Sequence, residues 1–113
     1  MILERFWRLD GHNPVPCTMM EWAKTMELGS RRVAETITKY ARVSTVFLGL
    51  DHRFGGGGPP ILFETMIFGL RSDHAYQDYQ ERCCTWDEAI AQHARAVEVA
   101  ARPPTRKKKR KTI

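Results

Sequence analysis

Two segments of the chain repeat apolar side chains at the spacing of an α-helix. In residues 19–28 and 86–101, apolar residues recur every three or four positions, so that each helix would have one apolar face. A Thr-x-x-Glu sequence opens each segment, with its threonine at Thr18 and at Thr85. This sequence is typical of a capping box, in which the threonine hydroxyl and the glutamate carboxylate each accept a backbone N–H at the helix start. Gly29 predicts the end of the first helix.

The chain between these helices is rich in β-branched and aromatic residues, which predicts strands. The two strongest strand patterns, at 43–50 and 61–69, flank ten residues rich in glycine and proline, so we expect a long hairpin with a mobile tip. An Asp-Gly turn signal predicts a second hairpin near the N-terminus. The expected strands are residues 5–9, 15–17, 31–40, 43–50, 61–69 and 76–84.

Helices towards both ends and strands between them are the pattern of an α+β protein. We therefore expect a mainly antiparallel sheet of four to five strands with two helices packed on one face. The length of 113 residues fits one domain, and a hydrophobic content of 42% is enough for a packed core. The apolar runs are far shorter than the roughly 18 residues of a membrane-spanning helix, and the first ten residues do not resemble a signal peptide.

Charge is distributed unevenly along the chain. Lysine and arginine together number 18 against 13 aspartates and glutamates, a formal net charge of +5. Residues 102–113 contain seven of the basic residues and no acidic one, which leaves residues 1–101 with a charge of about −2. We therefore expect a mildly acidic domain over residues 1–101 and a basic tail over residues 102–113. Three cysteines without the spacing of a disulfide framework indicate a reducing compartment.

The glycine-rich segment is the most conspicuous loop. A phosphate-binding loop needs its glycines to open a helix, whereas here Pro59-Pro60 and a strand follow them. A flexible hairpin tip is the simplest interpretation. The alternative is a partner-binding finger, because Arg53 and Phe54 are side chains of a kind that anchors interfaces. The residues of this candidate finger are Arg53, Phe54, Gly55, Gly56, Gly57 and Gly58.

One group of polar residues is a weak candidate for acid–base or metal chemistry. Asp51 and His52 follow a predicted strand, Glu64 lies inside a very apolar strand, and His93 lies on the apolar side of the last helix. Two histidines and two carboxylates can bind a metal or transfer protons if the fold brings them together. Their spacing matches no metal-binding motif, so we assign no metal and no cofactor. The favoured interpretation is a structural carboxylate with two hydrogen-bonded histidines.

The basic tail has two interpretations of similar weight. Its charges can keep the protein soluble, or they can neutralise nucleic-acid phosphates. No aromatic residue is interleaved with them, so nucleic-acid contact there would be independent of sequence. A nuclear localisation patch is a third interpretation, and it requires a eukaryotic setting. The candidate nucleic-acid-binding residues are Arg106, Lys107, Lys108, Lys109, Arg110 and Lys111.

Four stretches of the chain carry a family resemblance: DGHNPVPCTMMEWA (10–23), RRVAETI (31–37), VSTVFLGLDHRFGGGGPPILFETMIFG (43–69) and YQERCCTWDEAIAQH (79–93). Together they resemble a group of small hypothetical proteins encoded by tailed bacteriophages and prophages. The resemblance covers most of residues 5–100, and its long middle motif is specific. Members of the group usually stop soon after the final helix, so the basic tail is a departure. The group has no established activity, so the resemblance supplies no catalytic residue. It implies a phage accessory protein that acts in a bacterial cytoplasm.

These observations favour a binding protein over an enzyme. We expect a phage-encoded accessory module that inhibits or modulates a host macromolecule, with an anti-defence role as one form of this activity. Its partner would be a host or phage protein, with sequence-independent nucleic-acid contact through the tail and no contact with membranes. The alternatives are a small metal-dependent or acid–base enzyme using Asp51, His52, Glu64 and His93, and a virion-associated or assembly protein.

Overall fold

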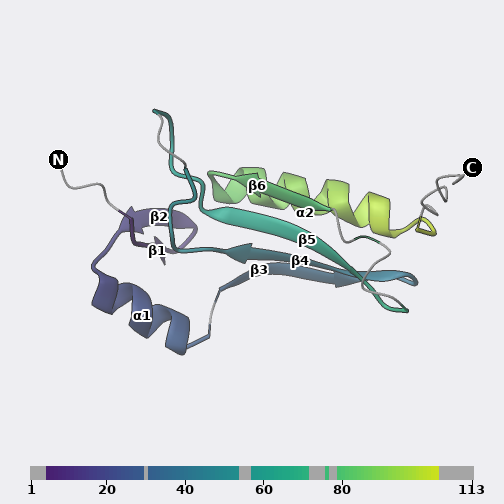
Figure 1. The fold of residues 1–113 in the computed structure, drawn as a ribbon, viewed down its shortest axis with the longest axis horizontal. Helices are drawn as coiled ribbons and strands as arrows, with labels where there is room; N and C mark the ends of the chain where they lie inside the picture. Colours follow the sequence, from purple (N-terminus) through teal and green to yellow (C-terminus); the bar gives the residue numbers. More distant parts are fainter. Residues whose placement is uncertain (1–4, 30, 54–56, 72–75, 77–78, 105–113) are drawn as a thin grey trace, which may run out of the picture.

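The computed structural model describes residues 5–29, 31–53, 57–71, 76 and 79–104. These residues form a two-stranded sheet, a four-stranded sheet and two helices, so the expected α+β class is confirmed (Figure 1). No helix within them is long and apolar enough to cross a membrane. In chain order the elements are β1 (Trp7–Asp10), β2 (Asn13–Pro16), α1 (Met19–Glu27), β3 (Arg32–Ile37), β4 (Ala41–Phe47), β5 (Phe63–Gly69), β6 (Gln80–Cys83) and α2 (Trp86–Ala100).

The expected N-terminal hairpin is present. Strands β1 and β2 pair antiparallel with Asp10 opposite Asn13, so that Gly11 and His12 form a two-residue turn. This is the position that the Asp-Gly signal predicts, because glycine adopts the backbone conformation of such a turn without steric cost.

Both capping boxes form as the sequence predicts. At the start of α1 the Thr18 hydroxyl accepts the N–H of Glu21 at 3.1 Å, and the Glu21 carboxylate accepts the N–H of Thr18 at 3.2 Å. Thr85 and Glu88 make the equivalent pair of bonds at the start of α2, each at 3.1 Å. Each box satisfies two backbone donors that a helix start would otherwise leave unpaired. Gly29 follows α1 with a φ of 81°, a conformation that favours glycine and ends the helix.

Helix α1 chiefly contacts β1, so the expectation that both helices pack on one face of the main sheet is correct for α2 alone. The cause is a tertiary contact at Gly49, which follows β4. A Cβ at Gly49 would lie 2.6 Å from Nε1 of Trp22 and 2.7 Å from Cε of Met26, so only glycine lets α1 approach this closely. The Trp22 ring also packs against Phe6, with ring centroids 5.3 Å apart. These contacts hold α1 at one end of the molecule (Figure 1).

The four-stranded sheet has the order β3-β4-β5-β6, and every neighbouring pair is antiparallel. The long hairpin expected between the two strongest strand patterns is β4 and β5, whose register places Thr45 opposite Thr65. The last strand is shorter than expected, since β6 covers Gln80–Cys83 within the predicted 76–84. Helix α2 covers one face of this sheet and contacts all four of its strands.

The core lies between α2 and the sheet. The odd-numbered residues of β4 and β5 are buried, whereas their even-numbered neighbours are partly exposed, because alternate side chains of a strand point to opposite faces. The buried apolar residues form two clusters. One contains Ala41, Val43, Ile67, Tyr76, Ala96 and Ala100, and the other contains Phe47, Leu62, Phe63 and Ala89.

Candidate functional site

Asp51 organises the base of the glycine-rich loop. Its Oδ1 accepts the N–H groups of Arg53 at 2.9 Å and of Ile61 at 3.1 Å, and its Oδ2 pairs with Nε of Arg53 at 2.6 Å. Burial by itself would raise the pKa of Asp51, but these hydrogen bonds and the Arg53 charge lower it below the ordinary value. Nη1 of Arg53 also donates to the backbone oxygen of Gly58. Asp51 and Arg53 therefore fasten the two sides of the loop together.

This arrangement bears on the candidate finger. The side chain of Arg53 is 26% exposed and is occupied by the internal ion pair, so it stabilises the loop. Gly57 and Gly58 are exposed. Phe54, Gly55 and Gly56 lie outside the described residues. A partner-binding role for the finger therefore stays a prediction.

Glu64 belongs to a polar ladder on the face of the sheet away from α2. Its Oε2 accepts hydrogen bonds from Nε2 of Gln80 at 2.6 Å and from Nε of Arg82 at 2.8 Å. Arg82 is also the cross-strand partner of Glu64 in the β5–β6 register. Opposite charges at directly paired positions stabilise a sheet by roughly 0.2–1 kcal/mol. The carboxylate is thus a structural one.

His93 lies in a polar network between α2 and the sheet. Its Nδ1 lies 2.7 Å from the hydroxyl of Thr45, and its Nε2 lies 2.9 Å from the hydroxyl of Thr36. His93 as a whole is 7% exposed, and burial lowers its pKa below the usual value of 6.5. The network consists of Thr36, His93, Thr45, Thr65, Gln92 and the backbone oxygen of Glu81.

One consistent assignment of donors and acceptors in this network starts at Gln92. Nε2 of Gln92 donates to the backbone oxygen of Glu81 at 2.9 Å and to the hydroxyl of Thr65 at 2.8 Å. Thr65 can then donate to Thr45 at 2.7 Å, and Thr45 to Nδ1 of His93. With Nδ1 as acceptor, the neutral ring carries its proton on Nε2. In this assignment His93 is neutral, in the same direction in which burial moves its pKa.

The four acid–base candidates do not come together. His93 lies on the face of the sheet that α2 covers, whereas Glu64 lies on the opposite face. Asp51 lies in the loop after β4, with His52 beside it in sequence, and the N–H of His52 donates to the backbone oxygen of Ile61 at 3.0 Å. Among the described residues, no group of three or more His, Cys, Asp or Glu side chains is arranged to hold a metal ion. This geometry gives no support to the enzyme hypothesis.

The cysteines lie in settings that keep their thiols protonated. Burial, and then the negative charge of Glu88, raises the pKa of Cys83 to about 11. The same two causes raise the pKa of Cys84, and burial followed by the Glu21 charge raises that of Cys17. Reactive cysteines instead have a lowered pKa and a positively charged neighbourhood.

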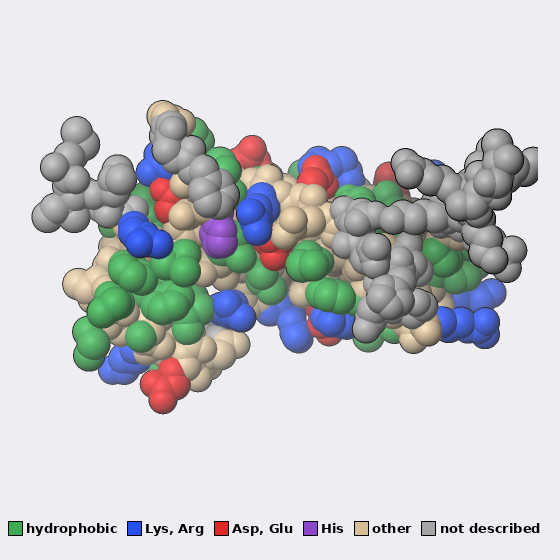
Figure 2. Space-filling model, in the orientation of Figure 1, with side chains coloured by type: hydrophobic (Ala, Val, Ile, Leu, Met, Phe, Trp, Pro, Cys, Tyr) green, Lys and Arg blue, Asp and Glu red, His purple; other side chains and the backbone are tan. Residues whose placement is uncertain are grey.

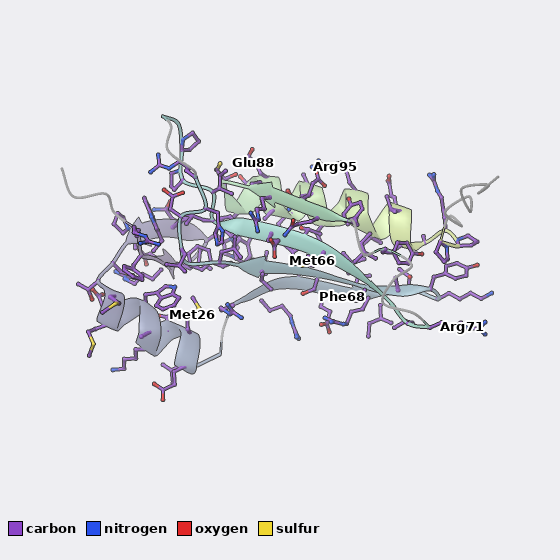
Figure 3. The ribbon with its side chains drawn as sticks, in the orientation of Figure 1. Met26, Met66, Phe68, Arg71, Glu88 and Arg95 are labelled. Atoms are coloured by element: carbon purple, nitrogen blue, oxygen red, sulfur yellow. The ribbon has the colours of Figure 1, made fainter. Side chains whose placement is uncertain are left out.

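The sequence analysis expected a sheet with helices on one face but did not identify the residues of the uncovered face as a candidate site. On this open face the Arg42 guanidinium lies 4.5 Å from the centroid of the Phe68 ring and 3.4 Å from the Glu35 carboxylate. Met66 and Phe68 lie on the side of β5 away from α2 (Figure 3). A partial signal was present in β4, where Arg42 and Ser44 alternate with apolar residues as in a strand with one solvated face, whereas β5 shows no such alternation. The open face comprises Arg32, Glu35, Ile37, Arg42, Ser44, Val46, Glu64, Met66, Phe68, Gln80 and Arg82.

The end of the molecule that carries α1 is apolar on its surface. Met19 is 60% exposed, and Met20 and Leu28 are each 77% exposed. Figure 2 shows hydrophobic side chains gathered over this end. Nε1 of Trp22 is buried there without a hydrogen-bond partner among the described residues.

The hairpin turn also rests on the start of α2. The rings of His12 and Trp86 stack with centroids 3.9 Å apart and planes 3° from parallel. Together with Asp10 and Asp87 they line an open pocket of about 360 Å³. The stack connects the two-stranded sheet to α2.

The six candidate residues of the basic tail, Arg106 to Lys111, lie outside the described part of the chain.

In comparisons with known proteins, no family model matches this chain, and no curated protein or solved structure shows significant similarity to it. The function must therefore be inferred from the residues and their geometry.

Proposed function

We propose that this protein is a non-enzymatic binding module, encoded by a tailed phage, that modulates a host macromolecule in the bacterial cytoplasm. An anti-defence role is one form of this activity. The folded domain would bind a protein partner, and the basic tail would add sequence-independent affinity for nucleic acid or nucleoprotein. The proposal keeps the phage setting that the sequence resemblance implies.

The open face of the main sheet is the observation that carries the proposal. Its centre holds Met66 and Phe68, and arginines paired with carboxylates surround them. Methionine, phenylalanine and arginine are enriched in protein interfaces, where apolar side chains form the centre and charged ones the rim. The polar candidates Asp51, Glu64 and His93 support the proposal in another way, because each is held in contacts that stabilise the fold.

Affinity capture with matched variants tests the proposal. The tagged full chain is incubated with lysate of the phage host, and the recovered protein and nucleic acid are identified. Met66→Glu places a charge in the centre of the open face and should reduce recovery of the protein partner about tenfold or more, as loss of an interface centre does. Ile90→Glu is the control, since Ile90 is an apolar residue that is 45% exposed on α2. It should leave recovery unchanged.

Three outcomes would contradict the proposal. The first is the recovery of neither protein nor nucleic acid at low salt, and the second is an equal loss of recovery in both variants. The third is the presence of the protein in purified phage particles, which would favour the virion-associated alternative. Circular dichroism of both variants separates a lost interface from a lost fold.

A further inference from the structure

The positive and negative side chains on the open face of the main sheet are unequally exposed. Arg82 is 35% exposed and its partner Glu64 is 12% exposed. Arg32 is 62% exposed and Arg42 is 36% exposed, whereas Glu35, which pairs with both of them, is 26% exposed. Each arginine is therefore more exposed than the carboxylate that it pairs with. A partner that approaches this face meets guanidinium groups before it meets carboxylates.

The arginines of the open face also outnumber its carboxylates. Nη2 of Arg32 lies 3.3 Å and Nη1 of Arg42 lies 3.4 Å from the same atom, Oε2 of Glu35. One carboxylate cannot neutralise two guanidinium groups, so part of their positive charge remains uncompensated. Residues 1–101 as a whole carry a charge of about −2. The open face is thus a locally positive surface on a mildly acidic domain.

Apolar side chains are interleaved with these cations. Arg42 is the cross-strand neighbour of both Ile37 and Phe68, and Arg32 is the neighbour of Val46. Val46 and Phe68 are half-buried, whereas Ile37, on the outermost strand β3, is 65% exposed. A partner that covers this face must therefore supply both apolar contacts and negative charge.

We infer that the open face binds an acidic protein surface, with an apolar centre flanked by carboxylates. The inference rests on the proposed function and adds the chemistry of the protein partner. A guanidinium group carries five N–H donors and forms strong, often paired hydrogen bonds with a carboxylate. The closest contact of each internal ion pair uses one guanidinium nitrogen. Donors therefore remain for an external carboxylate while the internal pair persists.

Nucleic acid is also negatively charged, but it fits the open face less well. Single-stranded nucleic acid binds by stacking its bases on aromatic rings. The Phe68 ring already has the Arg42 guanidinium over it, 4.5 Å from its centroid. A phosphate backbone would also extend beyond the face, where it would meet the net negative charge of residues 1–101. Carboxylates confined to the partner's own surface avoid this repulsion.

An anionic membrane is the other negatively charged surface to consider. Membrane-binding surfaces insert their apolar side chains into the boundary between headgroups and acyl chains. Ile37 projects from the open face, but Val46, Met66 and Phe68 are half-buried in the sheet beside charged neighbours. Such a face matches a protein surface that packs flat against it better than a bilayer into which side chains must project.

Titration with two matched synthetic peptides tests the inference on the full chain. One peptide has a central run of leucines flanked by glutamates, and the other has lysines in place of the glutamates. Binding is followed by NMR, and only through the backbone amides of β3 to β6, because the basic tail also attracts acidic peptides. The acidic peptide should shift these amides and bind at least tenfold more tightly than the basic peptide.

Two arginine variants provide a matched comparison. Arg32→Gln removes a cation of the open face but leaves Glu35 paired with Arg42, so the fold should persist. It should weaken binding of the acidic peptide about fivefold, the upper value for a partly exposed ion pair. Arg95→Gln is the control, because Arg95 is 59% exposed, pairs with Glu81 and lies on α2. It removes the same charge and should leave the affinity unchanged.

The inference is supported if the acidic peptide is preferred and only Arg32→Gln weakens its binding. Equal affinity for the two peptides, or equal weakening in the two variants, would overturn it. A larger response of the β3 to β6 amides to single-stranded DNA or to anionic phospholipid vesicles would also overturn it. The proposed function can be judged separately. If Met66→Glu abolishes capture of a protein partner while both peptides bind alike, the protein-binding role of the open face survives and this inference fails.

Discussion

At the scale of single residues, His93 couples the stability of the protein to pH. Burial holds its pKa in the folded protein below the usual 6.5, so below about pH 6.5 the unfolded chain binds a proton that the folded protein does not. The free energy of unfolding should therefore decrease as the pH is lowered through this range, by at most about 1.4 kcal/mol per pH unit from this group. His93→Gln should flatten this dependence, measured by urea denaturation between neutral and mildly acidic pH.

Thr36→Val is the matched control for this prediction. It removes the hydroxyl at Nε2 of His93 but retains the titrating ring. It should lower the free energy of unfolding at neutral pH by about 1 kcal/mol, the usual contribution of one hydrogen bond, and keep the steep pH dependence. If His93→Gln shows the same pH dependence as the parent, another group causes the effect.

The same residues show how far sequence analysis reaches at this scale. The pattern identified His93 and Glu64 as polar residues in apolar surroundings, and both have structural hydrogen bonds. It did not reveal that they lie on opposite faces of the sheet. The face of a strand residue depends on the register with the neighbouring strands, which long-range packing decides. The cluster inferred from the sequence therefore does not form, because strand pairing places His93 and Glu64 on different faces.

At the scale of secondary-structure elements, the features that depend on local chemistry were predicted correctly, whereas a feature that depends on tertiary packing was not. Both capping boxes and the N-terminal turn follow from short sequence signals, because their partners lie within three residues in the chain. The position of α1 depends instead on Gly49, which follows a different element. No local signal connects Trp22 to Gly49, so the packing of both helices on one face was predicted incorrectly.

Gly49→Ala tests whether this close approach holds α1 in place. The substitution adds a methyl group at a φ of 71° and within 2.6 Å of the Trp22 ring, so it combines backbone strain with a steric clash. Backbone strain alone costs about 1–3 kcal/mol. Gly11→Ala is the control, because Gly11 has a φ of 63° and open space around it. Thermal or urea unfolding should show a larger loss for Gly49→Ala, and equal losses would mean that α1 is held by other contacts.

At the scale of the whole molecule, the two halves of the fold are held with unequal strength. Helix α2 buries Ala89, Gln92, His93, Ala96 and Ala100 against the main sheet, whereas α1 has no fully buried residue and chiefly contacts β1. Local opening requires less free energy where fewer apolar side chains are buried. The overall class was predictable because alternating and helical patterns distinguish strands from helices. The unequal burial of α1 and α2 was not predictable, because it depends on which surfaces meet in the fold.

Native-state hydrogen exchange tests this inequality. Backbone amides of β4, β5 and α2 should exchange only through global unfolding, whereas amides of α1 should exchange through a smaller opening with weak dependence on denaturant. In Gly49→Ala, protection should fall further in α1 and β1 while the centres of β4 and β5 keep the protection set by global stability. Uniform protection in the parent protein would show that the hairpin, α1 and the main sheet unfold as one unit. In that case the exposed methionines of α1 would belong to a rigid surface, since no separate opening would move them.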